Sequence, residues 1–447
     1  MQNSNLLTGS ITKSLLIFAL PMIAGNLLQQ CYNIADTIIV GRFLGANALA
    51  AVGSAYTLMT FLTSIILGLC MGSGASFSIS YGRNNIDRLK IGIFQSFVFI
   101  ILVTIAINIL VFVGIDFIIW FLRVADPDVA GLMKTYLLVI FAGILATFFQ
   151  NYFSCLLRAL GNSKIPLVFL AVSALLNIVL DLLFVCVFHW GVAGAAFATI
   201  ISQYVSGIGL MIYTLIAFSD LRPERRHMRW NRTIFREITS FSFLTCTQQS
   251  VMNFGILLVQ GLVNSFGPVI MAAFAAAVKI DTFAYMPVQD FGNAFSTFIA
   301  QNYGARKEDR IRQGIKSAFL AASIFSIIVS AIVFIFAEPL MTLFINRNET
   351  AIISAGVCYL RIEGAFYVGI GILFLLYGLY RAVARPGMSV VLTIISLGTR
   401  VLLAYTLSAI PAIGVTGIWA AVPIGWALAD IVGITYWRRL SRRGMTL

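Results

Sequence analysis

The stretch YGRNNIDRLKIG at residues 81–92 returns as YGARKEDRIRQG at residues 303–314. The tyrosine, the first glycine, the Asp-Arg pair and the last glycine keep their spacing in both copies. Separate segments of the two halves match at the same distance along the sequence, to within one residue. This agreement predicts that the chain contains an internal duplication. The same offset pairs Gly45 with Gly267, Thr60-Phe61 with Thr282-Phe283, and Arg158-Ala159 with Arg381-Ala382.

Each half contains six apolar segments of the length that a membrane-spanning helix needs, about 20 residues. Of the 447 residues, 60% are hydrophobic and only 11% are charged, which excludes a soluble globular protein and a disordered one. The apolar runs are continuous and do not alternate with period two, which argues against a β-barrel. The expected spans are 13–40, 50–80, 90–114, 131–157, 165–188, 191–218, 238–264, 268–301, 313–336, 351–379, 388–410 and 414–437.

These spans predict an all-α polytopic membrane protein with twelve transmembrane helices. Six spans in each half bring both halves in from the same side, so we expect two six-helix bundles related by pseudo-twofold symmetry along the membrane normal. Such paired bundles are typical of secondary transporters, and the sequence has no GxxxxGK[ST] loop for ATP. The expected parts are an N-terminal bundle at 1–218, a basic cytoplasmic linker at 219–237, a C-terminal bundle at 238–437 and a basic cytoplasmic tail at 438–447.

The positive charge is expected on one side of the membrane. Most of the 30 lysines and arginines fall on the side of the two termini, and only Arg42, Arg123, Lys134 and Arg347 fall on the other. By the positive-inside rule, both termini are cytoplasmic, in a multi-pass protein of the bacterial cytoplasmic (inner) membrane. This topology accounts for the net charge of +13 without a nucleic-acid partner. The basic linker could also touch anionic lipid, although a topology signal is the simpler interpretation.

Two acidic residues of the first half are the main functional candidates. Asp36 lies in the first span and Asp181 in the fifth, where a charge costs at least ~2.5–3.5 kcal/mol. In the duplication they align with Leu258 and Ala404, so the scaffold is repeated but the acids are not. Packing would not require acids in one half only. We therefore expect an ion site in the N-terminal bundle.

Polar side chains accompany these acids at helical spacing. Together they could bind a proton or Na⁺, and their alternative role is to tie helices together. They are Gln29, Tyr32 and Asn33 on the first span, Asn151 on the fourth, Asn177 on the fifth, and Thr199 and Gln203 on the sixth.

Three further expectations concern other positions. Pro21 lies inside the first span, where a kink could either couple ion occupancy to helix shape or be static. The candidates for an aromatic, Met-containing substrate cleft are Met286 and Tyr367 in the second half, together with Gln29, Asn33 and Gln203 in the first. Glu363 is expected near the outer end of its span, with its carboxyl snorkelling to water. The sequence leaves open the roles of Lys279, Asp281, Glu363 and Arg400.

Several stretches resemble the multidrug and toxic compound extrusion (MATE) family over nearly the whole chain. The similarity is carried by ALPMIAGNLLQQCYNIADTIIVGRFLGANALAA at 19–51, LRALGNSKIPL at 157–167, LNIVLDLLFV at 176–185 and GVAGAAFATIISQ at 191–203. It is strongest to the DinF-like branch, whose first-helix proline matches Pro21. The resemblance to that branch implies a cation site made of Asp36, Asp181, Asn177, Thr199, Tyr32 and Asn151.

The NorM-like branch instead places acids on the seventh and tenth helices. Here the seventh span has Gln248 and Gln249, and Ile370 stands where the tenth-helix acid is expected, so the resemblance favours the DinF-like branch.

The resemblance implies a secondary active multidrug efflux transporter and not an enzyme. It would export bulky organic compounds, often cationic and aromatic, in antiport with H⁺ or Na⁺. Asp36, Asp181, Asn177 and Thr199 would be the metal ligands if Na⁺ is the coupling ion. We expect a monomer in contact with membrane lipid, with no cofactor besides that ion and no ATP. Two alternatives stay open: a flippase for lipid-linked oligosaccharides or related lipids, and a non-coupled membrane channel or sensor.

Overall fold

The computed structural model describes residues 6–121 and 126–442. Over these ranges the chain is helical and contains no strand. In the first half the helices are α1 (Ile11–Phe43), α2 (Ala46–Gly82), α3 (Ile86–Phe121), α4 (Pro127–Ala142), α5 (Ile144–Ala159), α6 (Lys164–Asp181), the π-helix η1 (Leu182–Val187) and α7 (Gly191–Ala217). Two 3₁₀ turns, η2 (Ser219–Leu221) and η3 (Arg225–His227), lie in the linker.

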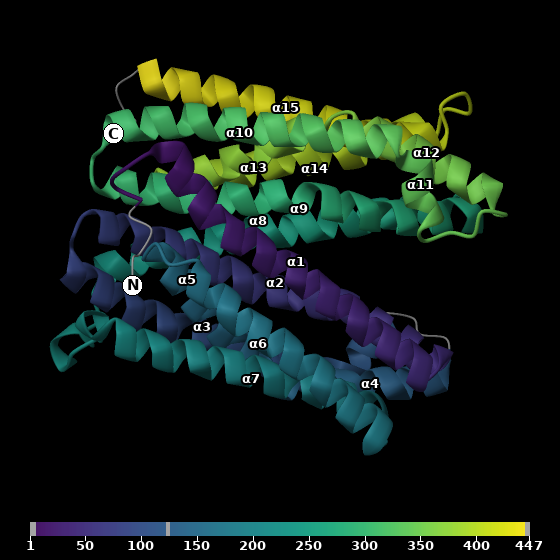
Figure 1. Cartoon of the computed structure of the whole chain (residues 1–447), viewed down its shortest axis with the longest axis horizontal. Coiled ribbons are helices and arrows are strands. Elements are labelled where there is room, and N and C mark those ends of the chain that lie inside the picture. The colour runs from purple at the N-terminus through teal and green to yellow at the C-terminus, as the bar shows by residue number, and fades with distance from the viewer. Residues whose placement is uncertain (1–5, 122–125, 443–447) are drawn as a thin grey trace. The chain divides into compact units, whose positions relative to one another are not determined.

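The second half has a similar order of elements, with one additional short helix, α11, and no π-helix among its described residues (Figure 1). Its helices are α8 (Arg232–Asn264), α9 (Pro268–Gly304), α10 (Glu308–Ile335), α11 (Ala337–Thr342), α12 (Thr350–Gly364), α13 (Tyr367–Ala382), α14 (Pro386–Ser408) and α15 (Val415–Arg442). The basic tail expected at 438–447 begins within α15, and residues 443–447 lie outside the described residues.

Nine single helices of the described chain are long and apolar enough to cross a membrane, and two bent pairs raise the number to eleven. The remaining expected span, 238–264, corresponds to α8, which has 33 residues but is not among the most apolar helices. Counting α8, the twelve segments expected from hydropathy are all present as helices.

Two of the expected spans are broken, which corrects the prediction of continuous helices at 131–157 and 351–379. The helices α4 and α5 meet at Gly143 with a bend of 47°, and α12 and α13 meet with a bend of 52°. At Gly143 an added Cβ would lie 2.4 Å from Ile200 Cγ1, so the close approach of α7 requires a glycine at this bend. A broken span keeps the composition of a continuous one, and hydropathy therefore does not detect it.

The described chain forms two compact units. The first unit consists mainly of Ala24–Cys246, and the second consists of Asn5–Ile23 with Thr247–Leu447. Two helices contribute to both units, because α1 and α8 each change unit along their length. This division by contacts differs from the expected division along the sequence, in which each bundle is one continuous segment.

Backbone proximity explains why the first part of α8 belongs to the first unit. A Cβ added to Gly72 on α2 would lie 2.4 Å from the backbone oxygen of Phe241, and one added to Gly68 would lie 2.6 Å from Cys246 Cα. Small residues permit such close helix packing in membrane proteins. A buried hydrogen bond of 2.8 Å between the hydroxyls of Ser73 and Ser242 adds to this contact.

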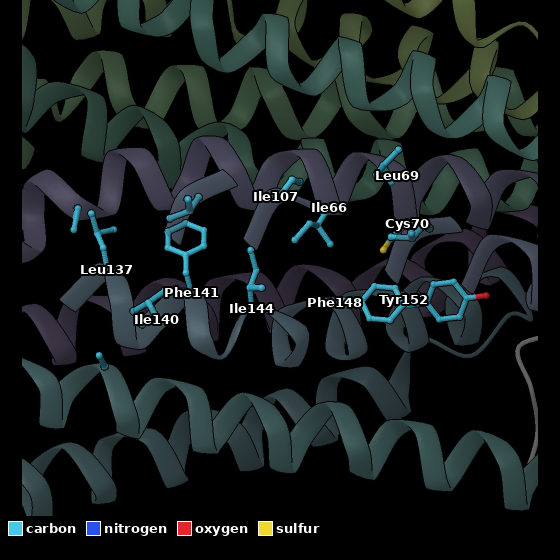
Figure 2. Close-up of a cluster of buried hydrophobic side chains, with 14 of the residues drawn as sticks. Ile66, Leu69, Cys70, Ile107, Leu137, Ile140, Phe141, Ile144, Phe148 and Tyr152 are labelled. Atoms are coloured by element: carbon cyan, nitrogen blue, oxygen red, sulfur yellow. The ribbon is translucent and has the colours of Figure 1, made fainter. Parts of the chain in front are cut away.

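The core of the first unit is formed mainly by apolar side chains of α2, α3, α4 and α5, with further residues from α1, η1 and α7. Figure 2 shows Phe141 before the bend and Phe148 and Tyr152 after it, so the cluster continues across the break at Gly143. Tyr152 carries a hydroxyl group into this cluster, and that hydroxyl donates to the backbone oxygen of Ile93 at 2.7 Å. Packing on both sides of the break therefore fixes the shape of the bent span.

Candidate functional site

The first unit brings Asp36 and Asp181 together. Asp36 lies on α1 and Asp181 is the last residue of α6, and their carboxyl groups lie within hydrogen-bonding reach of each other. Asp181 is 0% exposed and Asp36 is partly buried. Within the described chain, no donor reaches either oxygen of Asp181 or Oδ1 of Asp36. Because ionised carboxylates can only accept hydrogen bonds, this contact requires a proton or a cation between them.

Asp181 stands where the α-helix changes to a π-helix. The segment α6 ends at Asp181 and η1 continues the span from Leu182 to Val187. Short π segments interrupt the regular hydrogen-bond ladder and occur frequently at functional sites. The acid therefore lies at a local irregularity of its helix, which spacing in the sequence did not reveal.

Asn177 and Thr199 form the second element of the site. Nδ2 of Asn177 donates to Oγ1 of Thr199 at 3.4 Å, and Thr199 donates in turn to the backbone oxygen of Ala195 at 3.1 Å. Asn177 is 1% exposed, and no donor in the described chain reaches its Oδ1. One turn from Asp181, the chain thus offers further buried acceptor oxygen, as an ion site requires.

Tyrosines surround the acid pair. Tyr32 precedes Asp36 by one turn, contacts Gln29, and lies close enough to both acids to interact electrostatically. Tyr136 on α4 also lies near both acids and near Tyr32, and it is 3% exposed. Tyr136 was not among the residues predicted from the sequence. A buried tyrosine hydroxyl needs a polar partner, but nothing in the spacing of residues 131–157 connects this helix with α1 or α6.

Gln203 takes part in a contact between α5 and α7, and Asn151 makes a bond within α5. Oγ1 of Thr147 donates to Oε1 of Gln203 at 2.7 Å, and Nδ2 of Asn151 donates to the backbone oxygen of Thr147 at 2.8 Å. The bond between Thr147 and Gln203 is what the helix-tying role would produce, whereas the bond of Asn151 stays within one helix. Asn33, the remaining polar residue of the α1 face, is partly buried, and its backbone oxygen accepts from Thr37 Oγ1 at 2.8 Å.

The other sequence-based candidates lie in the second unit. Pro21 lies inside α1, in the part that belongs to the second unit. Met286 is 8% exposed and Tyr367 is 1% exposed, so both are packed within that unit and do not line an open surface. Glu363 is 1% exposed, and the expectation that its carboxyl snorkels to water is wrong.

One family model, MatE, matches the chain twice, at residues 21–183 and 244–406. The chain belongs to the MatE family. The two matched ranges confirm the internal duplication, because they are equal in length and keep the offset of the repeated stretches. MatE is a family of membrane transporters, as the resemblance implied. The family model does not separate the DinF-like from the NorM-like branch, so the branch stays a prediction.

Relatives extend this similarity over the whole chain. "Probable multidrug resistance protein YpnP" of Bacillus subtilis (strain 168) is 29% identical over 445 residues, which cover 98% of this chain and 97% of the relative. "Probable multidrug resistance protein NorM" of Thermotoga maritima is 24% identical over 94% of this chain and 90% of the relative. A solved outward-facing structure of a multidrug resistance MATE family transporter matches with a TM-score of 0.91 at 23% identity. The match covers 100% of this chain and 99% of the solved one. The predicted fold class is confirmed.

Proposed function

We propose that this protein is a secondary active efflux transporter that exports bulky organic compounds in exchange for protons bound at Asp36 and Asp181. The observation that carries the proposal is the direct contact between the two carboxyl groups. Several relatives are multidrug resistance or export proteins and another is an FAD transporter, which supports a small organic substrate.

The geometry favours a proton over Na⁺. A single shared proton gives the carboxyl pair the donor that it lacks among the described residues. A sodium ion would have to lie between the two acids and hold them apart, with Asn177 and Thr199 completing an oxygen shell. The sodium alternative uses the same residues, so the two ions are distinguished by imposing their gradients separately and not by the variants.

Coupling follows from the different charge of the site in its two states. A proton neutralises one acid of a buried pair, and its release leaves two negative charges in a place where charge is costly. The two states therefore favour different surroundings for α1 and α6. One pH unit contributes 1.36 kcal/mol per proton, and 100 mV contributes ~2.3 kcal/mol per charge. These energies would drive export without ATP.

The proposal includes the placement of the protein. The concentration of lysine and arginine at one side supports a bacterial cytoplasmic membrane with both termini in the cytoplasm. The transporter would act as a monomer, and its partners would be its organic substrate and the surrounding lipid.

The test is uphill efflux of a fluorescent organic cation from proteoliposomes, with H⁺ and Na⁺ gradients imposed separately. We expect the H⁺ gradient alone to drive efflux, and the variants Asp36→Asn and Asp181→Asn each to abolish it. The control is Asp116→Asn, which removes an exposed acid of the same unit that pairs with Lys134. Efflux driven only by Na⁺ would overturn the choice of ion. Full efflux in both variants would overturn the site, and a lipid-linked substrate would be tried next if no cation is moved.

A further inference from the structure

The second unit contains a buried charged cluster that the proposed function does not use. It consists of Asp281 on α9, Glu363 on α12 and Arg400 on α14, which interact electrostatically. Asp281 is 5% exposed and Glu363 is 1% exposed. The hydroxyl of Tyr359 joins the two acids, since it donates to Oδ2 of Asp281 at 3.5 Å and lies beside Glu363.

This cluster lies at the break between α12 and α13, the bent span of the second unit. Glu363 is the last residue but one of α12, and Tyr367 is the first residue of α13. The hydroxyl of Tyr367 lies beside Asp281, so groups from both sides of the break face the same acid. In membrane transporters, interrupted helices are a common place for ion sites, because the chain can accommodate polar groups there.

The cluster is short of hydrogen-bond partners. No donor in the described chain reaches Oδ1 of Asp281 or Oε1 of Glu363, and no acceptor there reaches Nε of Arg400. The titratable and charged groups that face the two acids are Tyr285 from α9, Tyr359 from α12, Tyr367 from α13 and Arg400 from α14.

Charge counting then decides the protonation state. Two ionised acids and one guanidinium leave one net negative charge in a buried position. Arginine stays charged in proteins, and an uncompensated buried charge is strongly unfavourable. One proton on the pair of acids removes the net charge and supplies one of the missing donors.

We propose that the second unit holds its own proton-binding site at the break between α12 and α13, where Asp281 and Glu363 share one exchangeable proton and Arg400 is the fixed counter-charge. In the duplication, Arg400 aligns with Asn177 of the first unit. The first unit has a neutral amide where the second has a permanent cation. The two halves thus bind protons with different charge balance, and release from the second site leaves one negative charge at the bend.

The first experiment looks for the proton itself. Infrared difference spectra between acid and alkaline pH are recorded for the purified full chain in the background of Asp36→Asn with Asp181→Asn, which removes the first site. We expect a protonated-carboxyl band to titrate in this background, and Glu363→Gln added to it to change that band. No titrating carboxyl band in the background, or a spectrum unaffected by Glu363→Gln, would overturn the proposal. Neither result depends on whether Asp36 and Asp181 drive transport.

The second experiment tests the counter-charge. Without Arg400 both acids need a proton, so the same background with Arg400→Met should bind one additional proton per molecule at neutral pH, counted with a pH-indicator dye. Arg400→Lys keeps the charge and should bind as many protons as its parent. The control is Arg361→Met, which removes an exposed arginine that lies over the Phe334 ring outside the cluster. Equal proton numbers for Arg400→Met and Arg400→Lys, both folded by size exclusion, would overturn the assignment of Arg400.

Discussion

Nδ2 of Asn177 donates to Oγ1 of Thr199 across 3.4 Å, and this bond joins α6 to α7 one turn before Asp181. It fixes the amide so that its oxygen remains available beside the acid, where the described chain provides no donor for it. The bond therefore belongs to the geometry of the proposed proton site as well as to helix packing.

Replacing Thr199 tests this role. A hydrogen bond of this kind contributes about 0.5–1.5 kcal/mol, so Thr199→Val should slow proton-driven efflux by up to about tenfold. Thr199→Ser keeps the hydroxyl and should stay near the wild-type rate. The measurement is the initial efflux rate as a function of external pH in proteoliposomes. A Thr199→Val protein with an unchanged rate and pH profile would show that the bond only packs helices.

The linker after α7 is held by a histidine contact that makes a second prediction. Nδ1 of His227 accepts from the backbone N–H of Glu224 at 3.1 Å, so Nε2 carries the ring proton and faces Oδ1 of Asp87 at 2.8 Å. His227 is 2% exposed. His227→Phe cannot make either bond, and trypsin should cleave faster at the exposed Arg225 and Arg229 beside it. If the linker of His227→Phe is cleaved at the wild-type rate, the histidine contact does not hold the linker.

Glu224 gives the same linker a pH dependence. The hydrogen bond from Lys90, at 3.2 Å, lowers the pKa of Glu224 from its usual 4.5. A lowered carboxyl pKa contributes stability that is present above the usual value and is lost as the pH falls through the lower, folded value. An acid-stable protease should therefore cut the linker of the wild type faster below about pH 4.5. The linker of Glu224→Gln should be cut at this faster rate already at higher pH. If the wild type and Glu224→Gln respond alike to pH, Glu224 does not hold the linker.

Helix packing in the first unit makes a prediction about stability. Gly72→Ala places a methyl group 2.4 Å from the backbone of Phe241, which cannot rotate away as a side chain could. Overpacking of this kind costs typically 1–3 kcal/mol, so the thermal unfolding midpoint should fall by several degrees. Gly53→Ala on the same helix is the matched control, because nothing lies within 4 Å of its added Cβ. Equal midpoints for the two variants would contradict the close approach of α2 and α8.

Hydropathy and internal repetition predicted the helices and their number well, since both depend on length and composition along the chain. Those signals could not place the breaks at Gly143 and after Gly364, because a bent span has the composition of a straight one. They also could not show that α1 and α8 each contribute to both units. The unit to which each part of these helices belongs is decided by packing between neighbouring helices. Such packing depends on close contacts like the one between Gly72 and Phe241.

The acids of the candidate site could be found from the sequence because a carboxylate inside an apolar span is unusual. Asp36 and Asp181 were selected on that ground, and the structure brings them together. Tyr136 was missed because a tyrosine in such a span is ordinary and its neighbours come from other helices. For the same reason, the spacing of Asp281 and Arg400 did not reveal the cluster that they form with Glu363.

The most direct test of proton exchange at Asp36 and Asp181 follows the proton during transport. Proteoliposomes are loaded with an organic cation and a pH-sensitive dye, with no ion gradient imposed, and the cation is then diluted outside. The account predicts that outward movement of the cation acidifies the lumen, and that Asp36→Asn and Asp181→Asn abolish this signal while Asp116→Asn keeps it. A lumen whose pH stays constant while the wild type exports the cation would contradict the account.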